Sequence, residues 1–543
     1  MKTTRPAAAR TSARAATRPA VPPPGPLASF LVACVVLAVY AWLAPPVAGD
    51  KDSSEFILVL ARLGTPHPTG YPIYTLLGHL FVSALHALGV GWARAGNVWS
   101  AVGGAAAMGL LHALAARLLA REGVAARAAG LLACLPVAAF ALNPLVTMET
   151  TLAEVNAFHL AWVMGAMLVT LVVSDGFARK DAADGDARRV AFAGFVAGLG
   201  LAHHATSVFV IAPLSLALVL QARAARRWTP ALLFAGLAGV LPPLAADLWT
   251  AWRTFHPVEP HWQSLEPSWA AWWRHVSGAE YRIYLGHYAP SSVQQGAMAT
   301  NLWPWFVPCA ALALLWAVRA RHSAGAVRIA WLVAIAATTA YARSYGVPDP
   351  SSYFLPPFLL AIATVPAALA GLASLRGVAR PAAALAGLAL LVQSVLWFRV
   401  GLQRREAYVV FEMRVHAMWR AIPFTEGFVL WPGDMIHRLH AYQWLDGEKP
   451  GLEAINPIEL THERPHAAFV RRHGFDPADR PRLEARLATS PPAGAHSFPE
   501  ALGLAIVDEI NAHTSQPVVL FRPEIPQLML LDKPGADTTR ARR

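Results

Sequence analysis

Long apolar runs separated by short polar stretches recur along most of this 543-residue chain. Many of the runs approach the ~20 residues that a helix needs to cross a bilayer, and they carry few charges. The pattern predicts about eleven transmembrane helices. One further apolar segment, 71–90, contains polar residues and is interpreted as an interfacial or re-entrant helix, with a full span as the alternative. The expected spans are 27–44, 98–119, 128–143, 155–174, 190–203, 207–221, 229–249, 300–318, 329–342, 353–374 and 381–398.

The composition supports a polytopic membrane protein. Hydrophobic residues make up 55% of the chain and charged residues only 14%, against about 25% charged residues in ordinary soluble domains. The net charge of +12 does not indicate nucleic acid binding, because the basic residues form short clusters between apolar runs and not one patch. The three cysteines all lie in apolar runs, without metal-ligand spacing or an even disulfide framework.

The basic clusters also predict an orientation. They fall in alternate connections and in the N-terminal tail, so the positive-inside rule makes their face cytoplasmic. We therefore expect an integral protein of the bacterial inner membrane, with a cytoplasmic N-terminus and a periplasmic C-terminal domain. The exoplasmic face then receives 45–97, 143–154, 204–206, 250–299, 343–352 and the chain after about residue 399.

Three regions follow from these patterns. Residues 1–26 form a basic cytoplasmic tail, and 27–398 form the transmembrane domain, whose exoplasmic loop 45–97 we expect to be catalytic. After residue 399 the composition becomes mixed and polar, with a late strand-like run, PVVLFRP. Residues 399–543 are thus expected to form a small soluble α/β domain.

The first exoplasmic loop has the densest chemistry in the chain. Asp52 and Glu55 are three residues apart, so on a helix their carboxylates share a face. Such a pair can divide its roles, one carboxylate taking a proton from an acceptor while the other orients it or binds a cation. The alternative is a solvated acidic helix N-terminus that the helix dipole favours.

A rigid hexapeptide, His-Pro-Thr-Gly-Tyr-Pro, follows this acidic segment. Its prolines prevent a helix from running through, and Gly70 allows a turn or a close backbone approach. His67 and Tyr71 would then be held beside the acidic residues. The alternative is a tight re-entry turn in which His67 is bound by a backbone carbonyl.

Together, DSSEF and the HPTGYPIY that follows it resemble the first exoplasmic loop of the GT-C membrane glycosyltransferases. The similarity is greatest to the protein O-mannosyltransferase-like branch and its bacterial relatives of unknown function. Ser54 stands where that family commonly has Gly, and Thr69 where it has Pro. The resemblance covers approximately residues 27–210. It implies a GT-C-like fold and transfer of a sugar from a polyprenyl-phosphate donor to an exoplasmic acceptor, with Asp52 matching the loop acid that activates or positions the acceptor.

A departing phosphate needs cationic donors, and several stand on the same face. Arg94 also matches an arginine of the mannosyltransferase-like pattern; the alternative is an interfacial snorkelling residue, which is common at span ends. For His203 and His204, an ordinary polar end of a span is the alternative. The candidates for binding the donor phosphate and sugar are His67, Tyr71, Arg94, His203, His204 and Arg343.

Four further residues are candidates for the acceptor or donor pocket: Glu149, Glu154, Asp349 and Tyr353. Carboxylates at a membrane boundary are costly, and so they suggest function. No spacing motif predicts a metal site, so no metal ligand or cofactor is assigned, although a divalent cation is left open.

These observations predict a GT-C-type glycosyltransferase that binds a lipid-linked sugar, a mannose-like hexose being favoured, with a protein, lipid or glycan as acceptor. Protein O-glycosylation is one form of this activity. The rival is a multi-pass transporter or lipid flippase. Transporters place ionisable residues near the bilayer midplane and often have repeated halves, whereas here the polar motifs gather at one surface and no repeat is visible. A scaffold without activity is the third alternative.

Overall fold

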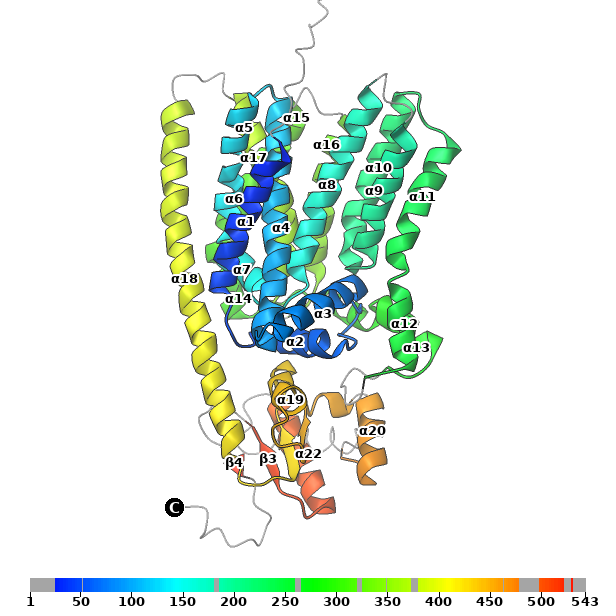
Figure 1. Ribbon diagram of the computed structural model, residues 1–543, viewed down its shortest axis with the longest axis vertical. Helices are drawn as coiled ribbons and strands as arrows, with labels where there is room; N and C mark the ends of the chain where they lie inside the picture. The colour runs from blue at the N-terminus through cyan, green and yellow to red at the C-terminus, as the bar shows by residue number, and fades with distance from the viewer. Residues whose placement is uncertain are drawn as a thin grey trace, which may run out of the picture.

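The structure is a computed structural model, in which helices dominate and a small sheet lies near the C-terminus (Figure 1). The expected fold class, a polytopic helical membrane protein with a small C-terminal α/β domain, is confirmed. The expected tail at 1–26 lies almost wholly outside the described residues. The structure describes residues 25–50, 52–179, 185–258, 265–319, 325–347, 349–372, 379–461, 463–477, 498–521 and 529–530.

Within these residues, seven helices or helix runs are long and apolar enough to cross a membrane, or up to nine if each of two bent pairs is one span. The seven are α1 (Pro26–Leu43), α4 (Trp92–Arg121), α8 (Asn156–Ala178), α10 with the short helix before it (Ala205–Ala224), α11 with α12 (Pro230–Phe255), α16 (Gly325–Ser344) and α17 with its preceding turn (Ser351–Ala370). The bent pairs are α5 and α6 (Ala126–Ala141) with α7 (Pro144–Thr151), and α14 (Ser292–Asn301) with α15 (Trp303–Arg319).

All eleven expected spans fall on helices, but two of those helices are not among these nine. The first is α9 (Asp186–Leu201), whose 16 residues are shorter than a straight span requires. The second is α18 (Ala379–Ala421), a long helix along one side of the bundle (Figure 1).

The bend between α6 and α7 has a local cause. The two helices meet at 82°. Asn143 caps α7 by accepting a hydrogen bond from the backbone N–H of Leu145, and Pro144 occupies the first helical position. Because a proline has no N–H and prevents the preceding helix from continuing, the chain starts a new helix in a new direction.

Several shorter helices gather at the lower end of the bundle in Figure 1, above the C-terminal domain. They include α2 and α3, which cross the end of the bundle and cover it. Helix α3 coincides with the segment 71–90, for which an interfacial or re-entrant helix is expected. These helices are α2 (Ser53–Arg62), α3 (Pro72–Ala87), α12 (Asp247–Phe255) and α13 (Trp269–Val276).

Close packing of α9 against α11 (Pro230–Leu244) depends on glycine. A Cβ atom on Gly194 would lie 2.0 Å from the carbonyl oxygen of Gly236, and one on Gly198 would lie 2.4 Å from that of Val240. In lipid there is no hydrophobic driving force between helices. Small residues let two helix backbones approach closely, and the resulting van der Waals packing holds the helices together.

The C-terminal domain is built on a sheet of four strands in the order β2-β1-β3-β4. β1 pairs in parallel with β2 and β3, and β3 pairs antiparallel with β4. Helix α18 runs from the bundle into this domain (Figure 1), so the expected boundary at residue 399 falls inside one helix. The elements are β1 (Gly427–Leu430), α19 (His437–Trp444), β2 (Leu452–Ile455), α20 (Glu463–His473), α22 (Phe498–His513), β3 (Val518–Leu520) and β4 (Met529–Leu530).

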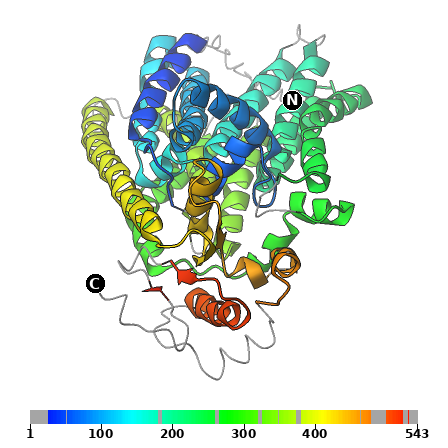
Figure 2. The same ribbon diagram turned by 60° about the horizontal axis from the view of Figure 1, so that its bottom comes forward.

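The domain lies against the end of the bundle that carries α2, α3 and α13, as Figure 2 shows from that end. Helix α19 and the short helix η5 (Asp434–Ile436) both contact α2. The exoplasmic segments expected at 45–97 and after residue 399 therefore meet.

Candidate active site

Helix α2 begins directly after Asp52. The carboxylates of Asp52 and Glu55 lie one helical turn apart, in different surroundings. Asp52 occupies the N-cap position but makes no side-chain capping hydrogen bond, and 39% of its side chain is exposed. Glu55, one turn later, is almost completely buried, with 3% of its side chain exposed. Asp52 is therefore the carboxylate that a substrate can reach, and Glu55 is a structural partner beneath it.

Glu55 holds His67 by two hydrogen bonds. The backbone N–H of His67 donates to Oε1 of Glu55 at 2.6 Å, and its ring Nδ1 lies 2.7 Å from Oε2. With Nδ1 engaged, the other ring nitrogen, Nε2, faces the hydroxyl of Tyr71 at 3.3 Å and Oδ2 of Asp52 at 3.9 Å. Glu55, His67 and Asp52 thus form a chain from the protein interior to the accessible surface.

This chain keeps His67 charged. Burial by itself lowers the pKa of His67, but the negative charges of Glu55 and Asp52 outweigh it and raise that pKa to about 9. Near neutral pH, His67 is therefore an imidazolium ion beside an accessible carboxylate. A cation in this position suits a leaving phosphate.

Tyr71 stands at the end of the rigid hexapeptide, just before α3. Its backbone is left-handed, with φ of 40°, after Gly70 with φ of 90°. Its hydroxyl donates to the carbonyl oxygen of Pro68 at 3.2 Å. Burial, and then the charges of Asp52 and Glu55, raise the pKa of Tyr71, so the phenol stays protonated as a hydrogen-bond donor.

The expected histidine pair lies beside this centre but does not carry positive charge. The rings of His203 and His204 are 6.3 and 5.9 Å from the ring of Tyr71. Burial lowers the pKa of His203 to about 4, and burial together with the neighbouring His203 and His67 lowers that of His204 to about 3. The expectation that they act as cations therefore needs correction: they are neutral imidazoles.

Both expected arginines have contacts outside this centre. Arg94 donates through its guanidinium to the carbonyl oxygens of Ala41 and Ala44, and so it caps the end of α1. The guanidinium of Arg343 lies 4.6 Å from the centre of the Tyr288 ring, on an exposed part of α16. Among the described contacts, neither reaches Asp52 or His67, so the expected phosphate-binding role of these arginines has no support from this geometry.

The remaining predicted residues are dispersed around the centre. Glu149, in α7, accepts a hydrogen bond of 2.7 Å from the side chain of Asn156, which is the first residue of α8. Glu154 is buried near Tyr71, whose pKa its charge helps to raise. The Glu149 contact thus joins α7 to the start of α8.

Asp349 and Tyr353 lie where the chain enters α17. Asp349 accepts hydrogen bonds from the backbone N–H and the hydroxyl of Ser351, at 3.1 and 2.6 Å, and so it stabilises the turn before the helix. The ring of Tyr353 lies 6.4 Å from that of His204 and 4.8 Å from that of Tyr345. Tyr353 thus borders the histidine pair, while Asp349 has a structural contact.

Asp52, Glu55 and His67 are also the group, within the described part of the chain, whose ligand atoms are close enough to hold a metal ion, all within 4.8 Å of one another. Nδ1 of His67 bonds to Glu55, which leaves Nε2, 3.9 Å from Asp52, as the ring nitrogen that could ligate a metal. Without a metal, the charged His67 forms an ion pair with these carboxylates.

The C-terminal domain contributes residues that the sequence did not reveal. Asp434, in η5, is accessible to solvent, yet desolvation by the surrounding protein, followed by the charges of Asp52 and Glu55, raises its pKa to about 6. Asp434 therefore adds another carboxylate to the centre. Nothing in the sequence near Asp434 indicates this contact, since Asp434 lies 382 positions after Asp52.

Arg438 fastens the same domain to the first loop. Its side chain is 1% exposed, forms an ion pair with Glu412 of α18 and donates to the carbonyl oxygens of Ala48, at 3.0 Å, and Gly49. Tyr408 of α18 donates to Asp50 at 2.6 Å. The chain just before Asp52 is thus held from both α18 and α19.

Tyr281 is a third residue that the sequence analysis missed. Its ring lies 6.2 Å from that of His67. Burial, and then Tyr71, Asp52 and Glu55, raise its pKa, so its phenol remains protonated beside the centre. Tyr281 lies in the segment 250–299, which the sequence predicts to be exoplasmic.

Comparisons with known proteins agree with the resemblance seen in the first loop. Residues 52–228 match the family model described as the Protein O-mannosyl-transferase TMEM260 N-terminal domain. Protein O-mannosyl-transferase tmem260 of Dictyostelium discoideum is 33% identical over 69 residues, which is 11% of this chain and 8% of that protein. The similarity to protein O-mannosyltransferase-like members of the GT-C membrane glycosyltransferases is thereby confirmed.

A solved structure is also similar. The apo crystal structure of the Archaeoglobus fulgidus oligosaccharyltransferase matches with a TM-score of 0.44 and 12% identity, over 79% of this chain and 65% of that one. The chain therefore spans less than two thirds of the length of either relative. The matched range 52–228 begins at Asp52 and includes Glu55, His67 and the histidine pair.

Proposed function

We propose that this chain is a membrane glycosyltransferase that moves a sugar, a mannose-like hexose being favoured, from a polyprenyl-phosphate donor to a protein acceptor on the exoplasmic side. The observation that carries the proposal is the Glu55–His67–Asp52 chain, which places a cation beside an accessible carboxylate at the end of a membrane bundle. The matched domain is named for protein O-mannosyl transfer.

The geometry supports a direct displacement at the anomeric carbon. Asp52 takes the proton of the acceptor hydroxyl, whose oxygen forms the new bond to the sugar while the bond to the phosphate oxygen breaks. The phosphate leaves with the bonding electrons and remains attached to the polyprenyl chain. His67, held in its charged form by Glu55, stabilises the negative charge that develops on this phosphate.

A lipid-linked donor fits this location. Its polyprenyl chain can remain among the apolar spans while its phosphosugar stays at the surface, where α2 and α3 cover the end of the bundle (Figure 1). A nucleotide sugar would need no such position. The polar groups of the centre lie at this end, which also disfavours a transporter with a site at the midplane.

The proposed orientation places this end of the bundle in the periplasm of a bacterial inner membrane. The basic connections support it by the positive-inside rule. Alkaline phosphatase fused after Arg543 should be active, and a fusion after Arg226 inactive; the reverse pattern would refute the orientation.

The donor class can be tested in membranes that contain the overexpressed chain. Radiolabelled polyprenyl-phosphate mannose, polyprenyl-phosphate glucose and a nucleotide sugar are supplied in turn. We expect label to enter protein from a polyprenyl-phosphate sugar and not from the nucleotide sugar. Transfer from the nucleotide sugar alone would refute the donor class, and lipid movement across the bilayer without transfer would favour a flippase.

A further inference from the structure

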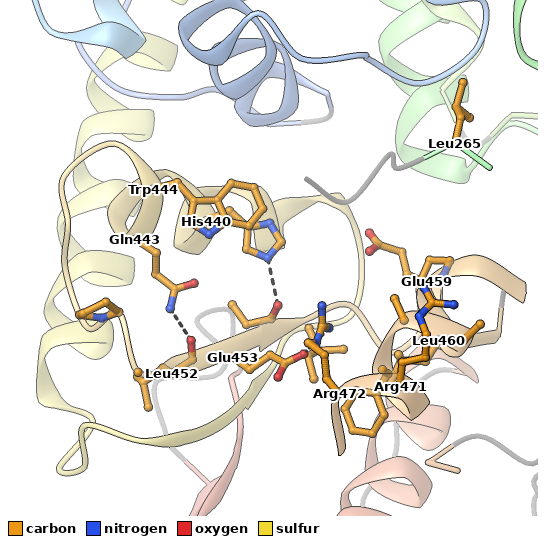
Figure 3. A pocket seen from close by; sticks show the side chains of 18 of the residues that line it. Leu265, His440, Gln443, Trp444, Leu452, Glu453, Glu459, Leu460, Arg471 and Arg472 are labelled. Atoms are coloured by element: carbon orange, nitrogen blue, oxygen red, sulfur yellow. Dashed lines mark hydrogen bonds and ion pairs between the residues drawn. The ribbon is translucent and has the colours of Figure 1, made fainter. Parts of the chain in front are cut away.

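A cleft of about 910 Å³ lies between the C-terminal domain and the segment that precedes α13. One wall consists of residues 265–267, and the other is formed by β2, α19 and α20 (Figure 3). Its volume exceeds what a single hexose needs and lies near the upper end of the usual range for ligand sites. Nothing in the reaction proposed for the Asp52 centre uses this cleft.

The cleft adjoins the Asp52 centre through α19. Trp444, at the end of α19, lines the cleft, and the guanidinium of Arg62 in α2 lies 5.7 Å from the centre of its ring. Helix α2 begins at Asp52 and carries Glu55. Glu459 lines the cleft too, and burial, helped by the charges of Asp434 and Glu55, raises its pKa. Helix α2 thus links the cleft to the Asp52 centre, with Arg62 at the cleft end and Asp52 about 15 Å away at the other end.

The aromatic residues of the cleft do not suit a sugar ligand. Sugar-binding clefts usually offer an open aromatic face to the apolar side of a pyranose. The ring of Trp444 already stacks on His440, with centroids 4.3 Å apart and planes at 3°, and it also contacts Arg62. Phe469 is fully buried. The lining thus has no uncommitted aromatic face among its described residues.

The edge strand of the sheet does not suit strand addition either. β2 is an edge strand and forms part of the cleft wall. Gln443 donates to the carbonyl oxygen of Leu452 at 2.7 Å, and Nε2 of His440 lies 3.0 Å from that of Ala454 (Figure 3). Because α19 already occupies these outward carbonyls, a ligand has to be bound by side chains and not by a new β-ladder.

Those side chains carry both signs of charge beside apolar groups. Glu266 supplies a carboxylate from one wall, and Arg471 supplies a guanidinium from α20. Burial raises the pKa of Glu459 to about 8, so near neutral pH its side chain is a protonated acid. Arg472 is paired with Glu453 at 2.6 Å (Figure 3). Leu460 and Ile455 supply apolar surface. This mixture complements the varied side chains of a polypeptide better than a lipid or a uniform glycan.

We infer that this cleft binds the acceptor as an extended polypeptide segment, recognised through its side chains and led toward Asp52. The inference rests on the proposed function for the identity of the acceptor. It gives the C-terminal domain a role in substrate selection.

Equilibrium binding tests this inference without turnover. The full chain in detergent is titrated against fluorescein-labelled 12-residue peptides that contain one Ser or Thr and have negative, zero or positive net charge, and against a labelled mannose oligosaccharide. Ala468→Trp places bulk in the cleft from α20. Val470→Trp is the matched control, because two residues further the side chain lies on roughly the opposite side of the helix and does not line the cleft. Thermal unfolding checks that both variants fold.

We expect at least one peptide to bind wild type, Ala468→Trp to weaken that binding at least tenfold, and Val470→Trp to change it less than twofold. Absence of peptide binding to wild type, equal binding by wild type and Ala468→Trp, or binding of the oligosaccharide in place of peptides would each overturn the inference. Peptide binding that responds as expected, in a chain that transfers no sugar from any donor, would refute the proposed function and leave the cleft assignment intact.

Discussion

At the scale of single residues, two carboxylates one helical turn apart have different tasks because their burial differs. The spacing of Asp52 and Glu55 predicted a shared face and divided roles, and the surroundings agree with a division in which Glu55 orients His67. The charge states could not be predicted. His67 and the neighbouring His203 and His204 look alike in sequence, but only His67 has carboxylates beside it, so only its pKa is raised.

The charge on His67 predicts a pH dependence. Its pKa of about 9 in the folded chain lies above the 6.5 of a free imidazole. The ion pair therefore contributes its full stabilisation below pH 6.5 and loses it as the pH rises through about 9. The rate of sugar transfer should fall over the same alkaline pH range, because His67 loses its charge there. This fall is the alkaline limb of the rate–pH profile.

Glu55→Gln tests the cause of that limb. Without the carboxylate, burial dominates, and the alkaline limb of the rate–pH profile should move down by more than about one pH unit. Glu406→Gln, which removes an exposed carboxylate on α18, is the control and should leave the profile in place. An unchanged limb in Glu55→Gln would show that the limb does not report His67.

At the scale of elements, hydropathy located the helices of the bundle because lipid requires long apolar segments with internally satisfied backbones. It could not show how they pack. The close contact of α9 with α11 depends on which glycines face one another, and the sequence alone gives no pairing. The path of α18 beyond residue 399 was missed for a related reason: its apolar half ends there, although the helix continues to Ala421.

Gly194→Ala tests the contact between α9 and α11. The added methyl group would lie 2.0 Å from a backbone carbonyl oxygen of α11, which no side-chain rotation relieves, so the helices must separate. We expect a loss of about 1–3 kcal/mol in stability, seen as a lower midpoint of thermal unfolding in detergent. In Gly165→Ala the nearest atom is a side-chain carbon at 3.8 Å, so stability should hold or rise slightly. Equal midpoints for both variants would contradict this packing.

At the scale of the whole molecule, the candidate site is shared between the membrane domain and the C-terminal domain. Asp434 approaches the Asp52 centre from a segment that lies far along the chain, and Arg438 secures that segment to Ala48 and Gly49. A sequence motif reports residues that are close along the chain. The first loop was therefore predicted, whereas the contribution of the C-terminal domain required the fold.

Arg438→Met should loosen this connection. Removing the cation of a buried ion pair leaves the charge of Glu412 uncompensated and costs about 3–5 kcal/mol. We expect faster proteolysis of the C-terminal domain and a lower unfolding midpoint. Arg420→Met removes an arginine whose side chain is 66% exposed beside Glu448 and should cost less than about 1 kcal/mol. If the two variants were equally resistant to protease, Arg438 would not be what fastens the domains together.

The most direct test of the account compares Asp52→Asn with Asp50→Asn in the transfer of labelled sugar from a polyprenyl-phosphate donor to protein. Asp50 lies two residues earlier and accepts a hydrogen bond from Tyr408, so its replacement controls for changes in the loop. We predict that Asp52→Asn lowers kcat by about 10²–10⁴-fold, the usual contribution of a general base, while Asp50→Asn keeps most of the activity. Full transfer by Asp52→Asn would contradict the central claim that Asp52 activates the acceptor.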